Sequence, residues 1–127
     1  MKIIKLRTAL TPILKEVHPK VYYEKVSSKA TFPYIVFNFP NSTDDGSLEQ
    51  FVLDVDAWDD PEDGDTTILE TLISNIDQIL NRRTISIGNI RATIYRDNRL
   101  VLEDDDPRIR RRKYIYQVRT YEKRGLN

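Results

Sequence analysis

The chain has 127 residues, no cysteine, and a formal net charge of zero from 20 basic and 20 acidic side chains. Without cysteine there is no disulfide, thiolate zinc site or cysteine nucleophile, and the balanced charge argues against an overall field that gathers nucleic acid. The length favours a single domain over residues 1–127. The N-terminus turns polar too soon for a signal peptide, and no apolar run approaches the ~20 residues of a membrane span. The sequence therefore predicts a soluble protein made in the cytoplasm, with no membrane association.

An amphipathic helix is predicted over Ile3–Val17. Its apolar side chains are spaced three and four residues apart, at Ile3, Leu6, Leu10, Ile13, Leu14 and Val17. Pro12 conflicts with an unbroken helix because it lacks a backbone donor and crowds the preceding turn. Either the helix kinks there, or Thr11 caps a second short helix that begins at Pro12.

Three strands are predicted next, at Val21–Val26, Phe32–Phe39 and Gln50–Asp59. In Gln50–Asp59 apolar residues alternate with polar ones, which indicates one face on a core and one toward water. Phe32–Phe39 is aromatic and β-branched on both faces, as in a central strand. Pro40–Ser47 between them has the composition of a turn, so these two strands are expected to form an antiparallel hairpin with a mobile tip.

A second helix follows the acidic turn Asp60–Asp65. Thr67 and Glu70 have the spacing of a capping box, and the helix is expected to run to Arg82. Its wide apolar stripe consists of Ile68, Leu69, Leu72, Ile73, Ile76, Ile79 and Leu80.

The remainder of the chain reads as short strands separated by polar turns. Extended segments are predicted at Ile85–Ile87, Asn89–Tyr95 and Leu100–Leu102, with a turn at Asp97-Asn98. After an acidic loop, the last strand is expected at Tyr114–Tyr121. The order α-β-β-β-α-β-β, with strands in runs, predicts an α+β domain: a mainly antiparallel sheet of about five strands with two helices packed on one face.

Few residues suggest chemistry. Asp54 and Asp56 share a strand face and could hold Mg²⁺ or exchange protons, but the favoured interpretation is the solvated face of a half-exposed strand. The only histidine, His18, ends a helix before a proline, where an exposed or capping role is ordinary. The four glycines are scattered, so no phosphate-binding loop is present. No catalytic, cofactor-binding or metal-binding residues are predicted.

Charge is segregated near the C-terminus, where four acids precede a basic run. The run Arg108–Lys113 could bind phosphate, could be a solvated loop, or could meet the acids of a neighbouring subunit. If it is a strand, Arg108, Arg110 and Arg112 point to one side and the residues between them to the other. We favour the subunit interpretation, because separate charge blocks at zero net charge suit protein partners. The residues expected at this interface are Glu103, Asp104, Asp105, Asp106, Arg108, Arg110, Arg111, Arg112 and Lys113.

Four stretches, in this order along the chain, resemble the tail completion proteins of long-tailed bacteriophages. They are Leu6–Leu10, Val21–Tyr23, Phe32–Phe37 and the strand Leu53–Trp58 that precedes an amphipathic helix. This family includes tail terminators, also called tail-to-head joining proteins. The resemblance spans nearly the whole chain and includes the tyrosine-rich last strand.

The resemblance implies a small α+β subunit in the tail or neck of the virion. It would assemble as a homo-hexameric ring on the tail tube, stop tube polymerisation and contact the head connector or head completion protein. No catalysis and no cofactor are expected, and DNA would pass through the lumen without specific binding. Exposed charge pairs are each worth only about 0–1 kcal/mol, so we hypothesise a monomer in solution whose ring closes only on the tail tip.

Two alternatives stay open at this point. One is another neck or tail structural protein, such as a head completion protein or a tube subunit, which self-assembly behaviour would distinguish. The other is a small DNA-binding module that uses Arg108–Lys113. We also predict that acids of Asp44–Asp65 and Glu103–Asp106 line part of the lumen.

Overall fold

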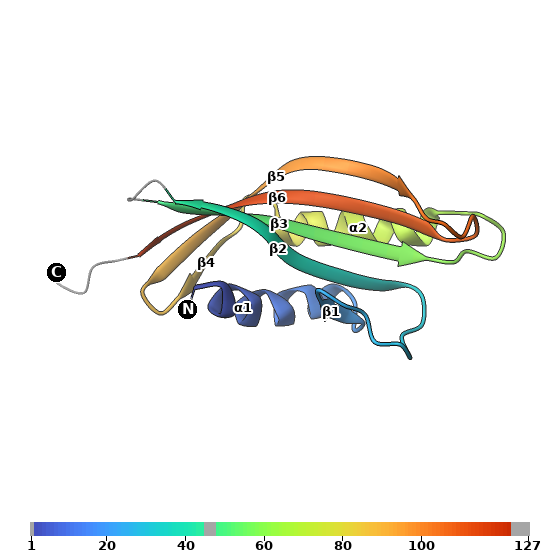
Figure 1. Ribbon diagram of the computed structural model, residues 1–127, viewed down its shortest axis with the longest axis horizontal. Helices are drawn as coiled ribbons and strands as arrows, with labels where there is room; N and C mark the ends of the chain where they lie inside the picture. The colour runs from blue at the N-terminus through green and yellow to red at the C-terminus, as the bar shows by residue number, and fades with distance from the viewer. Residues whose placement is uncertain (1, 45–47, 123–127) are drawn as a thin grey trace.

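The computed structural model describes residues 2–44 and 48–122. Its elements in chain order are α1 (Lys2–Val17), β1 (Val21–Tyr23), β2 (Tyr34–Asp44), β3 (Glu49–Asp59), α2 (Thr67–Leu80), β4 (Thr84–Ile87), β5 (Ile90–Glu103) and β6 (Arg110–Glu122). The strands form a six-stranded sheet in the order β1-β2-β3-β6-β5-β4. Both helices lie on one face of this sheet (Figure 1). The predicted α+β class, with a mainly antiparallel sheet and two helices on one face, is confirmed.

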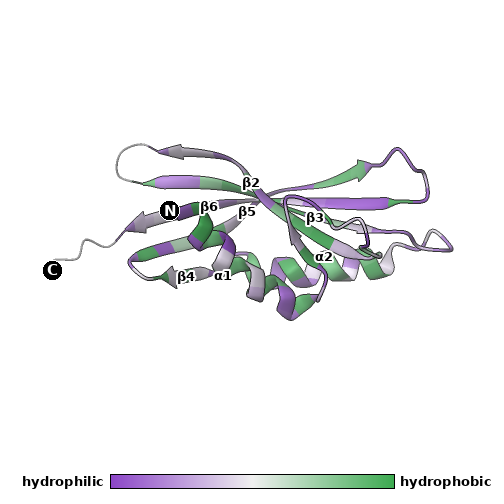
Figure 2. Ribbon diagram, turned by 60° about the horizontal axis from the view of Figure 1, so that its bottom comes forward, coloured by the Kyte–Doolittle hydropathy of each residue, from purple (hydrophilic) through white to green (hydrophobic). Residues whose placement is uncertain are grey.

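The core lies between the helices and the sheet, as the periodicity of each element requires. Every second residue of β3 faces the helices, and Leu53, Val55 and Ala57 are all fully buried there. The stripes of both helices meet this face, and apolar residues recur along both helices and along β3 in Figure 2. Burying one such aliphatic side chain contributes about 1.5–3 kcal/mol, so this layer dominates the stability of the fold.

Pro12 neither breaks α1 nor starts a second helix. The element runs unbroken from Lys2 to Val17, and the Thr11 hydroxyl donates to the Arg7 carbonyl at 2.8 Å. Leu10 and Leu14, on either side of the proline, are both fully buried. Their packing offsets the one backbone hydrogen bond that proline removes, so tertiary contacts decide the conformation here.

The strands differ in length from the predictions. β2 continues to Asp44 through a register shift between Asn38 and Asn41, so most of the predicted turn Pro40–Ser47 is strand; residues 45–47, the expected mobile tip, lie outside the described residues. The antiparallel hairpin with β3 is confirmed. The first strand ends early, at Tyr23, because Glu24 takes a positive φ of 64°.

The two segments predicted on either side of Asp97-Asn98 are one continuous strand. β5 pairs with β6 from Ile90 to Glu103, and a register shift between Arg96 and Asn98 replaces the expected turn. A bulge of this kind accommodates one extra residue without ending the ladder. The sheet also has a parallel pair, since β1 runs in the same direction as β2, and six strands where about five were expected.

The capping box predicted for Thr67 and Glu70 is wrong. The helix N-cap is Thr66, whose side chain makes no capping bond. Instead the Asp65 carboxylate accepts bonds from the Thr67 N–H at 2.9 Å and from its hydroxyl at 2.6 Å. Glu70 is directed to Arg112 of β6, and the helix ends at Leu80, before the expected Arg82.

Candidate assembly interface

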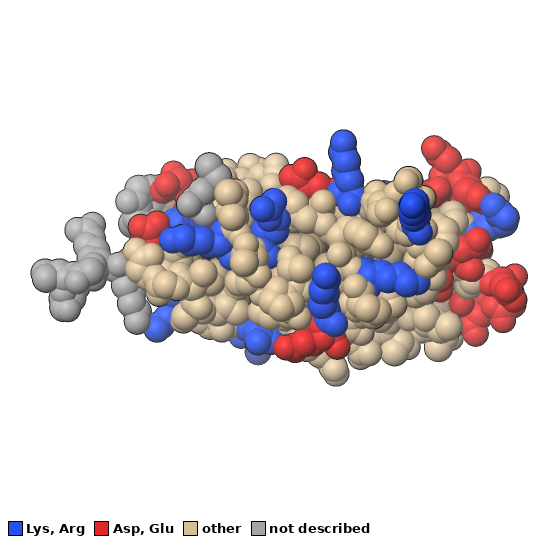
Figure 3. All heavy atoms as spheres, turned by 90° about the horizontal axis from the view of Figure 1, so that it is seen from below, with Lys and Arg blue, Asp and Glu red and all other residues tan. Residues whose placement is uncertain are grey.

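Two acidic loops that are distant in sequence lie at one end of the sheet. In β6, Arg110 is paired on one side with Asp59, the last residue of β3, and on the other with Glu103, the last residue of β5. The loops Asp60–Asp65 and 104–109 therefore extend from the same end of the molecule (Figure 1). Acidic side chains gather most densely at this end in Figure 3, and we call it the acidic end.

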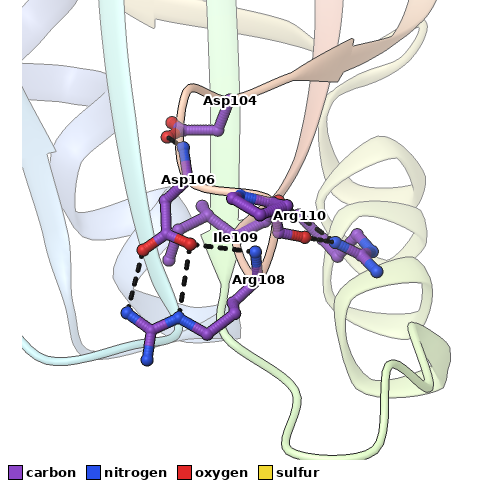
Figure 4. A network of polar contacts seen from close by, with 6 residues as sticks. Asp104, Asp106, Arg108, Ile109 and Arg110 are labelled. Atoms are coloured by element: carbon purple, nitrogen blue, oxygen red, sulfur yellow. Dashed lines mark hydrogen bonds and ion pairs between the residues drawn. The ribbon is translucent and has the colours of Figure 1, made fainter.

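The loop between β5 and β6 is held by local polar contacts (Figure 4). The Asp106 carboxylate accepts bonds from the Arg108 backbone N–H at 3.0 Å and from its guanidinium at 2.9 and 3.2 Å. The Asp106 N–H donates to an Asp104 carboxylate oxygen at 3.0 Å, and the Arg110 guanidinium donates to the Pro107 carbonyl. The hydrogen bonds from Arg108 lower the pKa of Asp106. Arg108 is thus compensated within its own loop.

The acids of β3 are buried, which corrects the prediction of a solvated strand face. Asp54 and Asp56 are only 9% and 7% exposed, although no helix covers their side of the sheet. Lys113 Nζ lies 3.3 Å from an Asp54 oxygen, and Arg111 Nη2 lies 3.2 Å from an Asp56 oxygen. These long side chains from the adjacent strand cover the carboxylates. Burial raises the pKa of Asp56 despite the opposing attraction of Arg111 and Lys113.

A row of aromatic rings continues from this cluster across the same face. Phe32 stacks on Tyr34 with ring centroids 5.1 Å apart, and Tyr34 stacks on Trp58 at 5.4 Å. The Arg111 guanidinium lies 4.7 Å from the centre of the Trp58 ring. Contacts of this kind stabilise the arrangement of the row. The sequence pattern alone does not reveal this row. The predicted hairpin places Tyr34 and Trp58 on neighbouring strands, but only the observed register pairs them directly.

The basic run does not form one positive surface. Arg111 and Lys113 lie on the face without helices, whereas Arg112 lies on the other and donates to Glu70 of α2 at 2.6 Å. This is the alternation expected of a strand. Four basic residues of the run, Arg108 included, are in ion pairs within the chain. Little uncompensated positive charge therefore remains for nucleic acid, which disfavours the DNA-binding alternative.

The acidic residues of the predicted interface form fewer ion pairs within the chain than the basic residues do. Among residues 2–44 and 48–122, ion pairs are found for Asp106 but not for Glu103, Asp104 or Asp105. The nine predicted interface residues lie together on and beside the turn between β5 and β6. Its exposed tip carries an excess of negative charge.

The single histidine makes a contact within the fold. His18 Nε2 lies 2.9 Å from the Pro33 carbonyl oxygen, a contact that ties the end of α1 to the start of β2. The described part of the chain contains no group of three or more side chains suited to hold a metal ion. None of its helices has the length and apolar character needed to cross a membrane.

Comparison with known proteins identifies a family. The sequence model of the family Tail completion protein gp17 matches residues 5–121. No curated protein matches the sequence. A chain from the virion of a native gene transfer agent particle has the same fold, with a TM-score of 0.70 at 10% identity, over 92% of this chain and 89% of that one. A second solved protein, which carries no descriptive name, gives a TM-score of 0.72 at 11% identity over 96% and 94% of the two chains.

At such low identities the two structures show a shared fold. The family match covers nearly all of the sequence and confirms the resemblance drawn from its motifs. This protein belongs to the tail completion protein gp17 family, structural proteins of the phage tail and neck.

Proposed function

We propose that this chain caps the tail tube as a hexameric ring, stops tube polymerisation and joins the tail to the head. The observation that carries the proposal is the family match over residues 5–121. The structure is compatible with a structural role, because the side chains of its polar clusters pair with each other. They form ion pairs and hydrogen bonds between strands and between strands and helices.

The acidic end is proposed to face the path of the DNA. Carboxylates repel the phosphate backbone, so an acidic lumen lets DNA slide without binding. The loops Asp60–Asp65 and Glu103–Asp106 supply this charge from a single end of the subunit. Asp44 belongs to the opposite end of β2, so the lumen assignment is restricted to these two loops.

The β5–β6 turn is proposed to contact the neighbouring subunit or the head protein through its charges. Its exposed pairs would contribute only about 0–1 kcal/mol each. Their main effect would be on register and on the rate of association. Arg111, Arg112 and Lys113 are already paired within the chain, so we expect them to support the turn. The charged contacts would be made by those of Glu103, Asp104 and Asp105 that do not face the path of the DNA.

The test is electron microscopy of tail-tube subunits from the same phage, polymerised with and without this protein. The proposal predicts tubes of limited length with a six-fold ring on one end. Tubes of unchanged length without a cap would contradict it and would favour a head-side neck protein.

A charge-reversal variant separates the acidic end from the rest of the surface. Asp104→Lys combined with Asp105→Lys should keep the fold and reduce capping or the passage of DNA. Glu16→Lys, which reverses one exposed acid of α1, is the control for charge reversal elsewhere on the surface. If both variants behave like the wild type, the acidic end has no part in assembly or DNA passage.

A further inference from the structure

We propose that neighbouring copies join edge to edge, with the free part of β5 of one copy pairing antiparallel to the free part of β2 of the next. This inference rests on the proposed ring and specifies how its subunits contact each other. The occupant of each free edge is therefore a second copy of this chain.

The first half of β5 is covered on its outer side. β4 pairs only with Ile90–Thr93. Beyond that point the Ile94 N–H donates to the Arg83 carbonyl at 2.8 Å, and the Arg96 N–H donates to the Asn81 side chain at 2.8 Å. Both N–H groups therefore point away from β6, and the turn between α2 and β4 satisfies them.

The second half of β5 is open. The register shift between Arg96 and Asn98 moves the outward position by one residue, and the Arg99 N–H is satisfied by the Asn98 side chain at 2.8 Å. Alternation then directs the backbone groups of Val101 and Glu103 outward. In the described part of the chain no further strand pairs with this edge, and Val101 is 72% exposed. A groove of about 460 Å³ adjoins Val101 and leaves room for side chains of an added strand.

On the outer edge of β2, the only strand that pairs among residues 2–44 and 48–122 is β1, and it covers the first half alone. β1 pairs only with Ile35–Phe37, and the Phe37 carbonyl accepts the Glu24 N–H, so Phe37 points outward. The register shift between Asn38 and Asn41 again moves the alternation by one, which directs the backbone of Ser42 outward. Pro40 has no N–H to offer, so pairing with another strand would begin after it.

The two edges are compatible in strand direction and in the side of the sheet toward which their side chains point. The four long strands β2, β3, β6 and β5 alternate in direction, so β5 of one copy and β2 of the next also run antiparallel. Val101 is paired with Arg112 and Ser42 with Phe51, and both partners lie on the side of the helices. If Val101 and Ser42 are placed opposite each other, the sheet continues with all helices on one side.

The offset of the two free edges suits a closed ring. The free half of β5 leads to the acidic end, whereas the free half of β2 leads to the opposite end of the sheet (Figure 1). Joining them shifts each copy along the strand direction. A closed sheet needs such a stagger, which tilts its strands to the axis. The contact is also heterologous, the kind that builds rings.

Disulfide trapping tests the pairing directly, because the chain has no cysteine of its own. The variant with Ser42→Cys and Val101→Cys should form covalent oligomers on mild oxidation, because opposite residues bring their Cβ atoms within about 5.5 Å. Ser42→Cys with Ile68→Cys is the matched control, since Ile68 is 66% exposed and lies on α2, not on a strand edge. Equal cross-linking of the two variants overturns the proposal.

A proline pair gives a second test that does not depend on cysteine chemistry. Val101→Pro removes an outward N–H, so the fold and Tm should be retained while association weakens by about fivefold to tenfold, one hydrogen bond per interface. Leu100→Pro removes a bond to β6 and should lower Tm. Unweakened ring assembly by Val101→Pro contradicts the pairing.

These outcomes are separable from the proposed function. Rings that cap tubes without a 42–101 disulfide overturn the edge pairing and leave the capping function standing. Cross-linked closed oligomers that do not cap tubes support the edge pairing and contradict the capping function.

Discussion

Replacing Arg111 with methionine removes the closest cationic partner of a carboxylate that is almost completely buried. Arg111 Nη2 lies 3.2 Å from Asp56, which is 7% exposed, while Lys113 stays 3.8 Å from the other carboxylate oxygen. Methionine keeps much of the aliphatic cover over Trp58. The variant therefore removes the positive charge, with its hydrogen bond to Asp56 and its cation–π contact with Trp58, and little of the packing.

The expected loss of stability follows from these contacts. Breaking a fully buried ion pair costs about 3–5 kcal/mol, but the Arg111 side chain is 26% exposed and Lys113 remains. We therefore expect about 2–3 kcal/mol, including the lost cation–π contact with Trp58. For a domain of this size this corresponds to a fall in Tm of roughly 6–15 °C.

The pH dependence gives an independent check. Burial raises the pKa of Asp56, so its folded-state pKa lies above the unfolded one. Its ionised form therefore lowers stability at neutral pH, and this cost is relieved as pH falls through the raised value. Without Arg111 the folded-state pKa rises further. The difference in Tm between wild type and Arg111→Met should therefore shrink as pH falls toward about 4.

The assay is thermal unfolding followed by circular dichroism at several pH values. The double variant Arg111→Met with Asp56→Asn removes both charges and should recover most of the loss. A single variant as stable as the wild type, or a double variant no better than the single one, would refute the argument that Arg111 compensates a buried charge.

Three further variants test local contacts. Tyr116→Phe removes a buried hydroxyl that donates to Asp77 at 2.8 Å and should cost about 1.5–3 kcal/mol in a denaturant titration; an unchanged midpoint would contradict this. Bonds from Thr67 lower the pKa of Asp65, so its carboxylate stabilises the fold above its unfolded pKa and this is lost as pH falls through the lowered value. Asp65→Asn should accordingly lower Tm at neutral pH and not in acid, and an equal effect at both pH values would argue against this. Gly64→Ala should cost about 1 kcal/mol through its positive φ of 76°, since the added Cβ meets only ordinary contacts; an unchanged Tm would mean that the turn adapts.

Much of the architecture could be predicted from local patterns. The stripe of α2 and the alternation of β3 identify their own buried faces, because the periods of 3.6 and 2 decide which residues share a side. The β2–β3 hairpin, the position of both helices on one face and the resemblance to tail completion proteins were all predicted and are confirmed.

Other features depended on competition between local signals and distant partners. Pro12 and Asp97-Asn98 both signal an interruption, yet α1 and β5 run through them. In each case the flanking residues pack or pair with elements far away in sequence, and those contacts outweigh the local cost. The parallel pairing of β1 with β2 had no local signal.

The charged residues of the candidate interface could be identified from the sequence, but only the tertiary structure determined which of them form ion pairs within the chain. Asp54 and Asp56 have the alternation of a solvated face, and they are buried because β6 places Lys113 and Arg111 over them. These partners lie 59 and 55 residues away in the chain. The same strand brings the two acidic loops to one end of the sheet. Composition determined which charges are present, and strand order and register determined which of them neutralise each other, because ion pairing depends on distances that the folded sheet alone establishes.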